Sequence, residues 1–259
     1  MNRAVAAVHV GLLVAGRQLR SVVASPALAL PPPVASVAFL AAFAGGLGAL
    51  GDLPGLDFPG GYTGFCAVYL IVVSAAFGGV LSGLALVEDY EAGMVRRLLL
   101  APVARGAVLA GYVAAGVVRG LVTAVIVAVV ACASGVPAPS AQAGIGVLGL
   151  CALVATATGL WSVAVGVRSQ STAAGAVMQL PVFLALFAGP VFAPEEFQAG
   201  WLDRVGAVNP LAHAVTASRS LVAGTSNGLG SAVVMMVGLI TVLSWWVGRS
   251  AAGAGSLER

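Results

Sequence analysis

The sequence predicts an all-α membrane protein with six transmembrane helices, and three observations support this. Charged residues make up 8% of the 259-residue chain and the hydrophobic set makes up 60%, compared with about 25% and 45–50% in soluble domains. The mean hydropathy is +1.05. Six segments remain apolar over the roughly 20 residues that a helix needs to cross a bilayer. A soluble fold of this length could not bury so much apolar surface, so we expect the lipid bilayer to be the solvent.

An amphipathic segment precedes the predicted spans. Residues 3–24 carry apolar side chains at Val5, Val8 and Leu12, with arginines interspersed. This pattern predicts an interfacial helix lying along the membrane surface; a disordered basic tail is the alternative. The six spans then cover approximately residues 32–51, 62–87, 107–134, 143–167, 172–192 and 229–248 of a single transmembrane domain, residues 1–259.

The connection before the last span differs from the other loops. Residues 193–228 contain Trp201 and an Asn209-Pro210 break. The segment predicts one or two short helices at, or dipping into, the outer interface, where Trp201 would act as an anchor. Irregular backbone at that depth is tolerated only where protein covers it or water reaches it.

Arginines set the expected orientation, because cytoplasmic loops carry an excess of basic residues. With a cytoplasmic N-terminus, nine arginines fall on the inner side and two fall on the outer side, both within residues 193–228. The sequence therefore predicts a multi-pass protein whose N- and C-termini are both cytoplasmic.

Catalytic chemistry is sparse. All twelve basic residues are arginine, and a phosphate-binding P-loop needs a lysine, so the chain cannot hydrolyse ATP by that route. His9 and His213 have no carboxylate or second histidine at metal-ligand spacing, and Glu195-Glu196 is most simply a solvated loop face. No basic stripe with interleaved aromatic residues suggests nucleic-acid binding. We expect no enzyme activity, bound cofactor, metal or nucleic-acid partner for this chain.

Arg119 is the only ionisable residue within a predicted span. Charges at that depth are costly and often functional, so Arg119, Thr123 and Gln179 could line a substrate path. The alternatives are that Arg119 snorkels or pairs with another span, and that hydroxyls such as those of Thr158 and Ser162 hydrogen-bond between helices.

The spans also contain small residues at four-residue spacing, such as Gly79/Gly83 and Gly116/Gly120. This spacing allows close helix packing, although 35 glycines make it frequent by chance.

Charge is concentrated between the second and third spans, where residues 88–105 hold six of the chain's charged side chains. Acids come first and arginines last, the order that a helix dipole favours. Met94, Val95, Leu98 and Leu99 add an apolar stripe. We predict a short amphipathic cytoplasmic helix over residues 88–101, ended by Pro102; a charged loop that only sets topology is the alternative. The charged residues are Glu88, Asp89, Glu91, Arg96, Arg97 and Arg105.

Two blocks resemble the permeases of type-2 ATP-binding-cassette (ABC-2) exporters, closest to the daunorubicin-resistance type. The first block is Glu88-x-x-Glu91-x-Gly93, Arg96-Arg97-Leu98-Leu99 and Pro102-Val103-x-Arg105. The second is Asn209-Pro210-Leu211 followed by Arg219-x-Leu221-x-x-Gly224. Two positions depart from the family pattern: Met94 replaces a threonine, and Tyr112 lies where a lysine is common.

The resemblance implies a permease subunit of the bacterial plasma membrane that lacks its own ATPase site. A separate P-loop subunit, present in two copies, would bind ATP and Mg²⁺, and the helix at 88–101 would dock into a groove on it. Two permease chains, identical or different, would form the path. The apolar spans suit a hydrophobic or amphipathic cargo such as a drug, antibiotic or lipid.

Three other functions remain as alternatives. A secondary transporter or channel would normally show ionisable residues at the midplane or discontinuous spans in two corresponding halves, and the sequence shows neither pattern clearly. A membrane scaffold without transport and a membrane enzyme are further alternatives.

Overall fold

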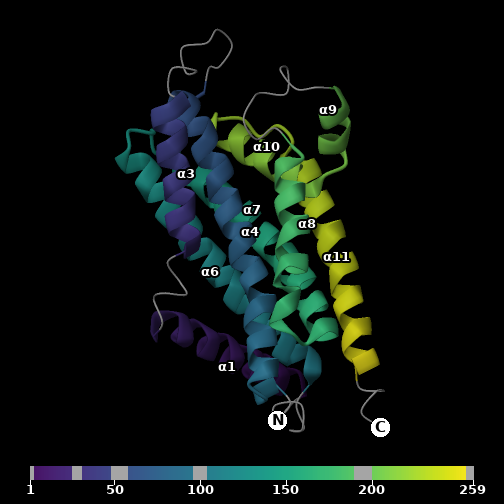
Figure 1. The fold of residues 1–259 in the computed structure, drawn as a ribbon. Helices are drawn as coiled ribbons and strands as arrows, with labels where there is room; N and C mark the ends of the chain where they lie inside the picture. The colour runs from purple at the N-terminus through teal and green to yellow at the C-terminus, as the bar shows by residue number, and fades with distance from the viewer. Residues whose placement is uncertain (1–2, 25–30, 48–57, 96–103, 190–199, 255–259) are drawn as a thin grey trace.

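Helices form an upright bundle with shorter helices across both of its ends (Figure 1). The computed structural model describes residues 3–24, 31–47, 58–95, 104–189 and 200–254. Within these ranges every regular element is a helix, which agrees with the predicted all-α class.

Four helices in the described residues are long and apolar enough to cross a membrane. They lie over the second, third, fourth and sixth predicted spans. They are α4 (Gly61–Glu91), α6 (Arg105–Ala133), α7 (Ala141–Ser169) and α11 (Leu229–Ala254).

The first and fifth predicted spans contain shorter helices. The first holds α3 (Pro31–Leu47), which begins at a run of prolines, a residue tolerated in the first helical turn. The fifth begins with a short 3₁₀ helix, η2 (Thr172–Ala174), which leads into α8 (Gly175–Phe187). The last residues of both predicted spans lie outside the described residues. Among the described residues, four helices rather than six therefore have spanning length.

Three helices lie at the ends of the bundle. The N-terminal α1 (Arg3–Ala24) crosses the lower end in Figure 1, and α9 (Gly200–Ala207) and α10 (Pro210–Val222) lie at the upper end. These helices occur where the sequence predicted an N-terminal amphipathic helix and short helices before the last span. The start of α1 and the end of α11 lie at the same end (Figure 1), the arrangement that termini on one side of the membrane require.

The end of α4 differs from the prediction, in which a new helix started at residue 88. α4 continues to Glu91, so the acidic residues occupy its last turn. The helix ends because Gly93 adopts φ +73°, a left-handed conformation that glycine takes without steric cost. Met94 and Val95 then resume helical conformation.

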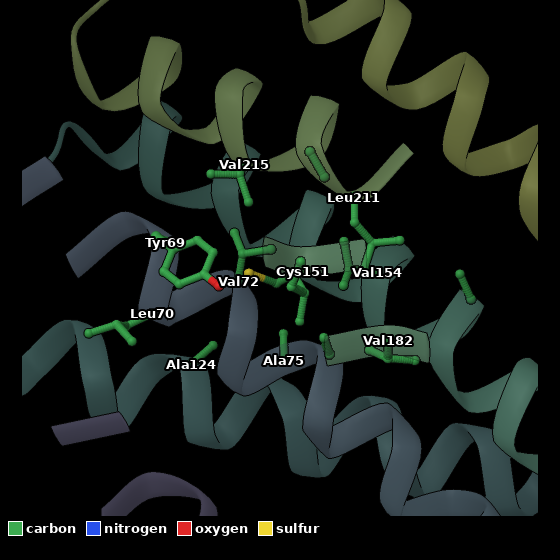
Figure 2. Packing of buried hydrophobic residues seen from close by; sticks show 14 of the residues in the cluster. Tyr69, Leu70, Val72, Ala75, Ala124, Cys151, Val154, Val182, Leu211 and Val215 are labelled. Atoms are coloured by element: carbon green, nitrogen blue, oxygen red, sulfur yellow. The ribbon is translucent and has the colours of Figure 1, made fainter. Parts of the chain in front are cut away.

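The core is built around α4, which packs most extensively on α7 and α6. Apolar side chains from several helices converge on one cluster, part of which is drawn in Figure 2. Its labelled members include Val72 and Ala75 of α4, Ala124 of α6, Val154 of α7, Val182 of α8 and Val215 of α10. Because α4 is surrounded by other helices, movement of its lower end would be transmitted to most of the bundle.

Small residues let α4 approach its neighbours closely, as their spacing had suggested. A Cβ atom on Gly83 would lie 2.4 Å from the backbone of Ser162 in α7, and one on Gly78 would lie 2.2 Å from the Cα of Gly120 in α6. Hydroxyls bridge the α4–α7 contact: Thr158 Oγ1 donates to the carbonyl of Ala76 at 2.8 Å. These buried hydroxyls therefore serve helix packing.

Candidate functional site

The last turn of α4 carries three acidic side chains at the end of the bundle where α1 crosses (Figure 1). Asp89 is half-buried, whereas Glu88 and Glu91 are exposed. All three belong to the charged segment, residues 88–105, that the family resemblance implies would couple this chain to a partner subunit, and we call its predicted members the coupling residues. The structure places these three in one helical turn.

Asp89 is the centre of a hydrogen-bonded network that joins α1, α4 and α6. Its Oδ2 accepts hydrogen bonds from Gln18 Nε2 at 2.7 Å and from Tyr112 Oη at 2.5 Å. Arg17 forms an ion pair with the same carboxylate, and its NH2 also donates to Tyr112 Oη at 3.2 Å. Side chains from two other helices thus share one carboxylate of α4.

The network offsets an unfavourable position for an acid. Negative charge at a helix C-terminus is disfavoured by the helix dipole, and the Arg17 guanidinium compensates for it at Asp89. The side chains of Arg17 and Asp89 are 36% and 17% exposed, so solvent screens the pair only in part. Burial lowers the pKa of Arg17, but the hydrogen bond and charge of Asp89 outweigh burial and raise it above its ordinary value. Arg17 is therefore charged whenever Asp89 is ionised.

Glu91 makes a second link, to the connection between α7 and α8. Its Oε1 accepts hydrogen bonds from the backbone N–H of Thr172 at 2.8 Å and from Thr172 Oγ1 at 3.0 Å. The carboxylate therefore caps the N-terminus of η2, where negative charge is favourable. Because η2 leads directly into α8, Glu91 connects the lower end of α4 to the base of α8.

The remaining predicted coupling residues lie partly beyond the described ranges. Arg105 begins α6, and its NH1 donates to the carbonyl oxygen of Ala251 in α11 at 3.4 Å. Gly93 ends α4. The predicted coupling residues outside the described residues are Arg96, Arg97, Leu98 and Pro102.

Sequence reasoning did not identify Arg17, Gln18 and Tyr112 as partners of Asp89. Arg17 counted only toward orientation, and Tyr112 was merely a departure from the family pattern. The departure was in fact informative, because Tyr112 is fully buried and its hydroxyl contacts Asp89. No sequence spacing relates positions so far apart in the chain; only the crossing of α1 over α6 brings them together.

The second group of predicted residues lies at the opposite end, on α10. The side chain of Asn209 caps this helix by accepting a hydrogen bond from the N–H of Leu211 at 3.1 Å, and Pro210 occupies the first turn, where its missing N–H costs nothing. Asn209 Nδ2 also donates to the carbonyl oxygens of Ala185 and Ala188 at 2.5 and 3.0 Å. Asn209 therefore both starts α10 and ties it to the end of α8.

We expect Asn209→Ala to destabilise the folded protein by about 2 kcal/mol, because it removes a helix cap and leaves carbonyls of α8 without their donor. Thermal unfolding of purified protein in detergent measures the change. Asn209→Asp is the matched variant, since it keeps the capping oxygen but loses the donor to α8. If the Asp variant is as stable as the native protein, the tie to α8 contributes nothing.

Arg219 joins the other side of α10 to the first turns of α4. The guanidinium carbon lies 3.4 Å from the centroid of the Phe65 ring, and Nε donates to the carbonyl oxygen of Phe65 at 3.3 Å. Arg219 is only 6% exposed. A buried arginine of this kind combines cation–π and hydrogen-bond contacts. Asn209 and Arg219 therefore both hold the upper end of the bundle together.

The three candidate path residues lie on two helices, α6 and α8. Gln179 is exposed on α8, which packs against α4, α7 and α10. Thr123 is buried on α6 and donates to the carbonyl of Arg119 in its own helix at 2.9 Å. Arg119 is half-buried on α6. The described residues also contain no group of three or more His, Cys, Asp and Glu side chains that could hold a metal ion.

The family model for the ABC-2 type transporter matches residues 12–222. This range includes the helix α10 and the last turn of α4 with the side chains bound to Asp89 and Glu91, which we call the charged joint. No curated protein matches the chain.

Proposed function

Because the chain belongs to the ABC-2 type transporter family and is a multi-pass membrane protein, we propose that it is the permease of an ATP-driven exporter. In this proposal it lies in a bacterial plasma membrane with both termini in the cytoplasm. It moves a hydrophobic or amphipathic molecule outward, and a separate ATP-binding subunit supplies the energy.

The charged joint at the lower end of the bundle carries the proposal. The end of α4 is linked to α1 through Asp89 and to η2 through Glu91, and Arg105 links the start of α6 to α11. A force applied to residues 88–105 would therefore reach four other elements through direct side-chain contacts. This is the arrangement that a site of energy input needs.

A partner is required because the chain contains no lysine for a phosphate-binding loop. We propose that two ATP-binding subunits hold ATP and Mg²⁺ and contact two permease chains. The segment that follows Gly93, with Arg96 and Arg97, would dock on the partner, while the acids of α4 pass the movement into the bundle.

The apolar character of the spans supports a cargo with an apolar part, such as a drug, an antibiotic or a lipid. The exposed side chains of α6 and α8 are mostly aliphatic or aromatic, including Val122, Val129, Leu180 and Phe183. Such faces suit contact with lipid tails and with amphipathic molecules dissolved in them.

The proposal is tested with the double substitution Arg96→Ala/Arg97→Ala and with Glu91→Gln. The permease is co-expressed with a candidate P-loop ATP-binding protein, and co-purification and stimulated ATP hydrolysis are measured. We expect the arginine variant to reduce co-purification by roughly tenfold, because rim charges guide docking. Glu91→Gln keeps docking but lowers stimulation, because Glu91 contacts η2 rather than the partner.

Arg168→Ala is the control, since Arg168 is an exposed arginine in the last turn of α7 and its substitution removes one of the two positive charges that the paired substitution removes. Its docking and stimulation should match those of the native protein. If the paired arginine substitution leaves docking and stimulation unchanged in correctly inserted protein, residues 88–105 are not the docking segment.

A further inference from the structure

Arg119 is placed where an arginine cannot readily reach water. It is the central residue of α6, with fourteen residues of the helix on either side. At 1.5 Å per residue its Cα therefore lies about 21 Å from each end of a helix that crosses a hydrocarbon core about 30 Å thick. An arginine near a helix end can extend its side chain to the polar interface of the membrane. Arg119 lies at the middle of its helix, far from both interfaces.

The helix cannot rotate to hide this side chain. At the same level Gly120 packs directly on α4, because the site of a Cβ on Gly78 lies 2.2 Å from the Gly120 Cα. Thr123, one turn further along α6, donates its hydroxyl to the backbone carbonyl of Arg119 at 2.9 Å.

Arg119 forms no ion pair within the described residues. Its Nε atom is buried and has no hydrogen-bond partner there, and the ion pair found in those residues joins Arg17 to Asp89 instead. Glu88 is the acid whose charge acts on Arg119, and the two side chains form no ion pair within the described residues. Arginine stays protonated in proteins, so it cannot escape the cost by losing its charge.

The exposed part of Arg119 lies beside an exposed apolar face of α6. The residue is half-buried, and the neighbouring face of α6 is exposed at Val118, Val122, Val125 and Ile126. A counter-charge can therefore arrive from the lipid side without disturbing the α4–α6 contact. A guanidinium binds phosphate or carboxylate oxygens through two parallel hydrogen bonds.

We propose that Arg119 binds the anionic headgroup of an amphiphile that reaches it from the bilayer, with the apolar tail lying along the exposed valines of α6. An anionic amphiphile would then be the transported molecule, and only this identification as cargo rests on the proposed function. Glu88, toward the lower end, disfavours anionic groups there, so binding is strongest at the level of Arg119.

The test uses the permease alone in phosphatidylcholine nanodiscs. Fluorescent phosphatidylglycerol and phosphatidylcholine probes with identical tails are titrated, and the ratio of their affinities is measured. We expect the native protein to prefer the anionic probe and Arg119→Gln to lose at least about tenfold of this preference, the effect of one charge-assisted hydrogen bond. Arg168→Gln, which removes an exposed charge at a helix end, keeps the preference.

Two further variants keep the proposal open to contradiction. Arg119→Lys retains the charge and should lose only part of the preference, which provides a readout if the glutamine variant folds poorly. Glu88→Gln should keep or increase the preference. An unchanged preference in Arg119→Gln overturns the proposal. The stability of the double variant Arg119→Gln/Glu88→Gln is compared with that of the two single variants. If each single variant loses as much thermal stability as the double variant and the preference is kept, the two side chains form an internal pair. That result also overturns the proposal.

Adding the ATP-binding subunit distinguishes the source of the amphiphile. ATP-dependent movement of the anionic probe between leaflets, lost in Arg119→Gln, identifies the amphiphile as cargo. Binding without movement identifies it as a lipid held at Arg119. The binding measurement needs no ATPase, so a failure of the exporter proposal leaves it intact.

Discussion

Replacing Gly83 with alanine is expected to lower the free energy of unfolding by about 2–3 kcal/mol, the cost of forcing a methyl group into a closed packing contact. The new Cβ would lie 2.4 Å from the carbonyl carbon and oxygen of Ser162. Because the opposing atoms are backbone, α4 and α7 must separate to admit it. That separation would also break the hydrogen bond from the N–H of Gly83 to Ser162 Oγ, now 3.1 Å long.

The measurement is the midpoint of thermal unfolding of the purified protein in detergent. Gly149→Ala is the matched control, because Gly149 also lies inside α7 but a Cβ there meets nothing within 4 Å. That variant should be neutral or more stable, since alanine favours a helix over glycine by roughly 0.5–1 kcal/mol. Equal effects of the two substitutions would show that helix propensity, and not the α4–α7 contact, decides stability.

Replacing Asp89 with alanine is expected to release α1 from the bundle. The change leaves Arg17, Gln18 and Tyr112 without the carboxylate that they share. The ion pair is partly exposed, so we expect a cost of about 2 kcal/mol, between that of a surface pair and that of one broken in the interior. Amide hydrogen exchange in α1 should therefore accelerate by about tenfold or more, and ATPase-coupled transport should fall with it.

Two comparisons make the Asp89 test specific. Arg20→Ala removes an exposed charge from the same helix and should leave exchange in α1 unchanged. Arg17→Ala combined with Asp89→Ala should cost less than the sum of the two single changes, because each single change leaves an uncompensated partner. Strict additivity would mean that the two side chains stabilise α1 independently.

The positions of most helices could be predicted because apolar length is a local property of the chain. The spans predicted at 107–134 and 143–167 end within two residues of α6 and α7. The N-terminal segment and α10 were also found from local signals: an amphipathic pattern in residues 3–24 and the Asn209-Pro210 helix start.

The charged segment was harder to place because its local signals conflict. Acids followed by arginines favour a new helix at residue 88, on the assumption that each acid must complement its own helix dipole. The structure instead continues α4 to Glu91. The dipole penalty at its end is offset by Arg17 from α1 and by the N–H of Thr172, and neither partner is near in sequence.

What the sequence by itself determined is therefore the bilayer as solvent, the helical class, the approximate spans and the stretches that carry charge, because each depends on residues within one helix length. The tertiary structure alone decided which charges are shared and which are left over. Asp89 found three partners because α1 crosses α6 beside the end of α4. The buried Nε of Arg119 found no hydrogen-bond partner in the described residues, at the level where Gly120 packs on Gly78 of α4. A hydrogen bond or ion pair joins atoms a few ångströms apart whatever their separation along the chain, so only the packing of the helices could settle these pairings.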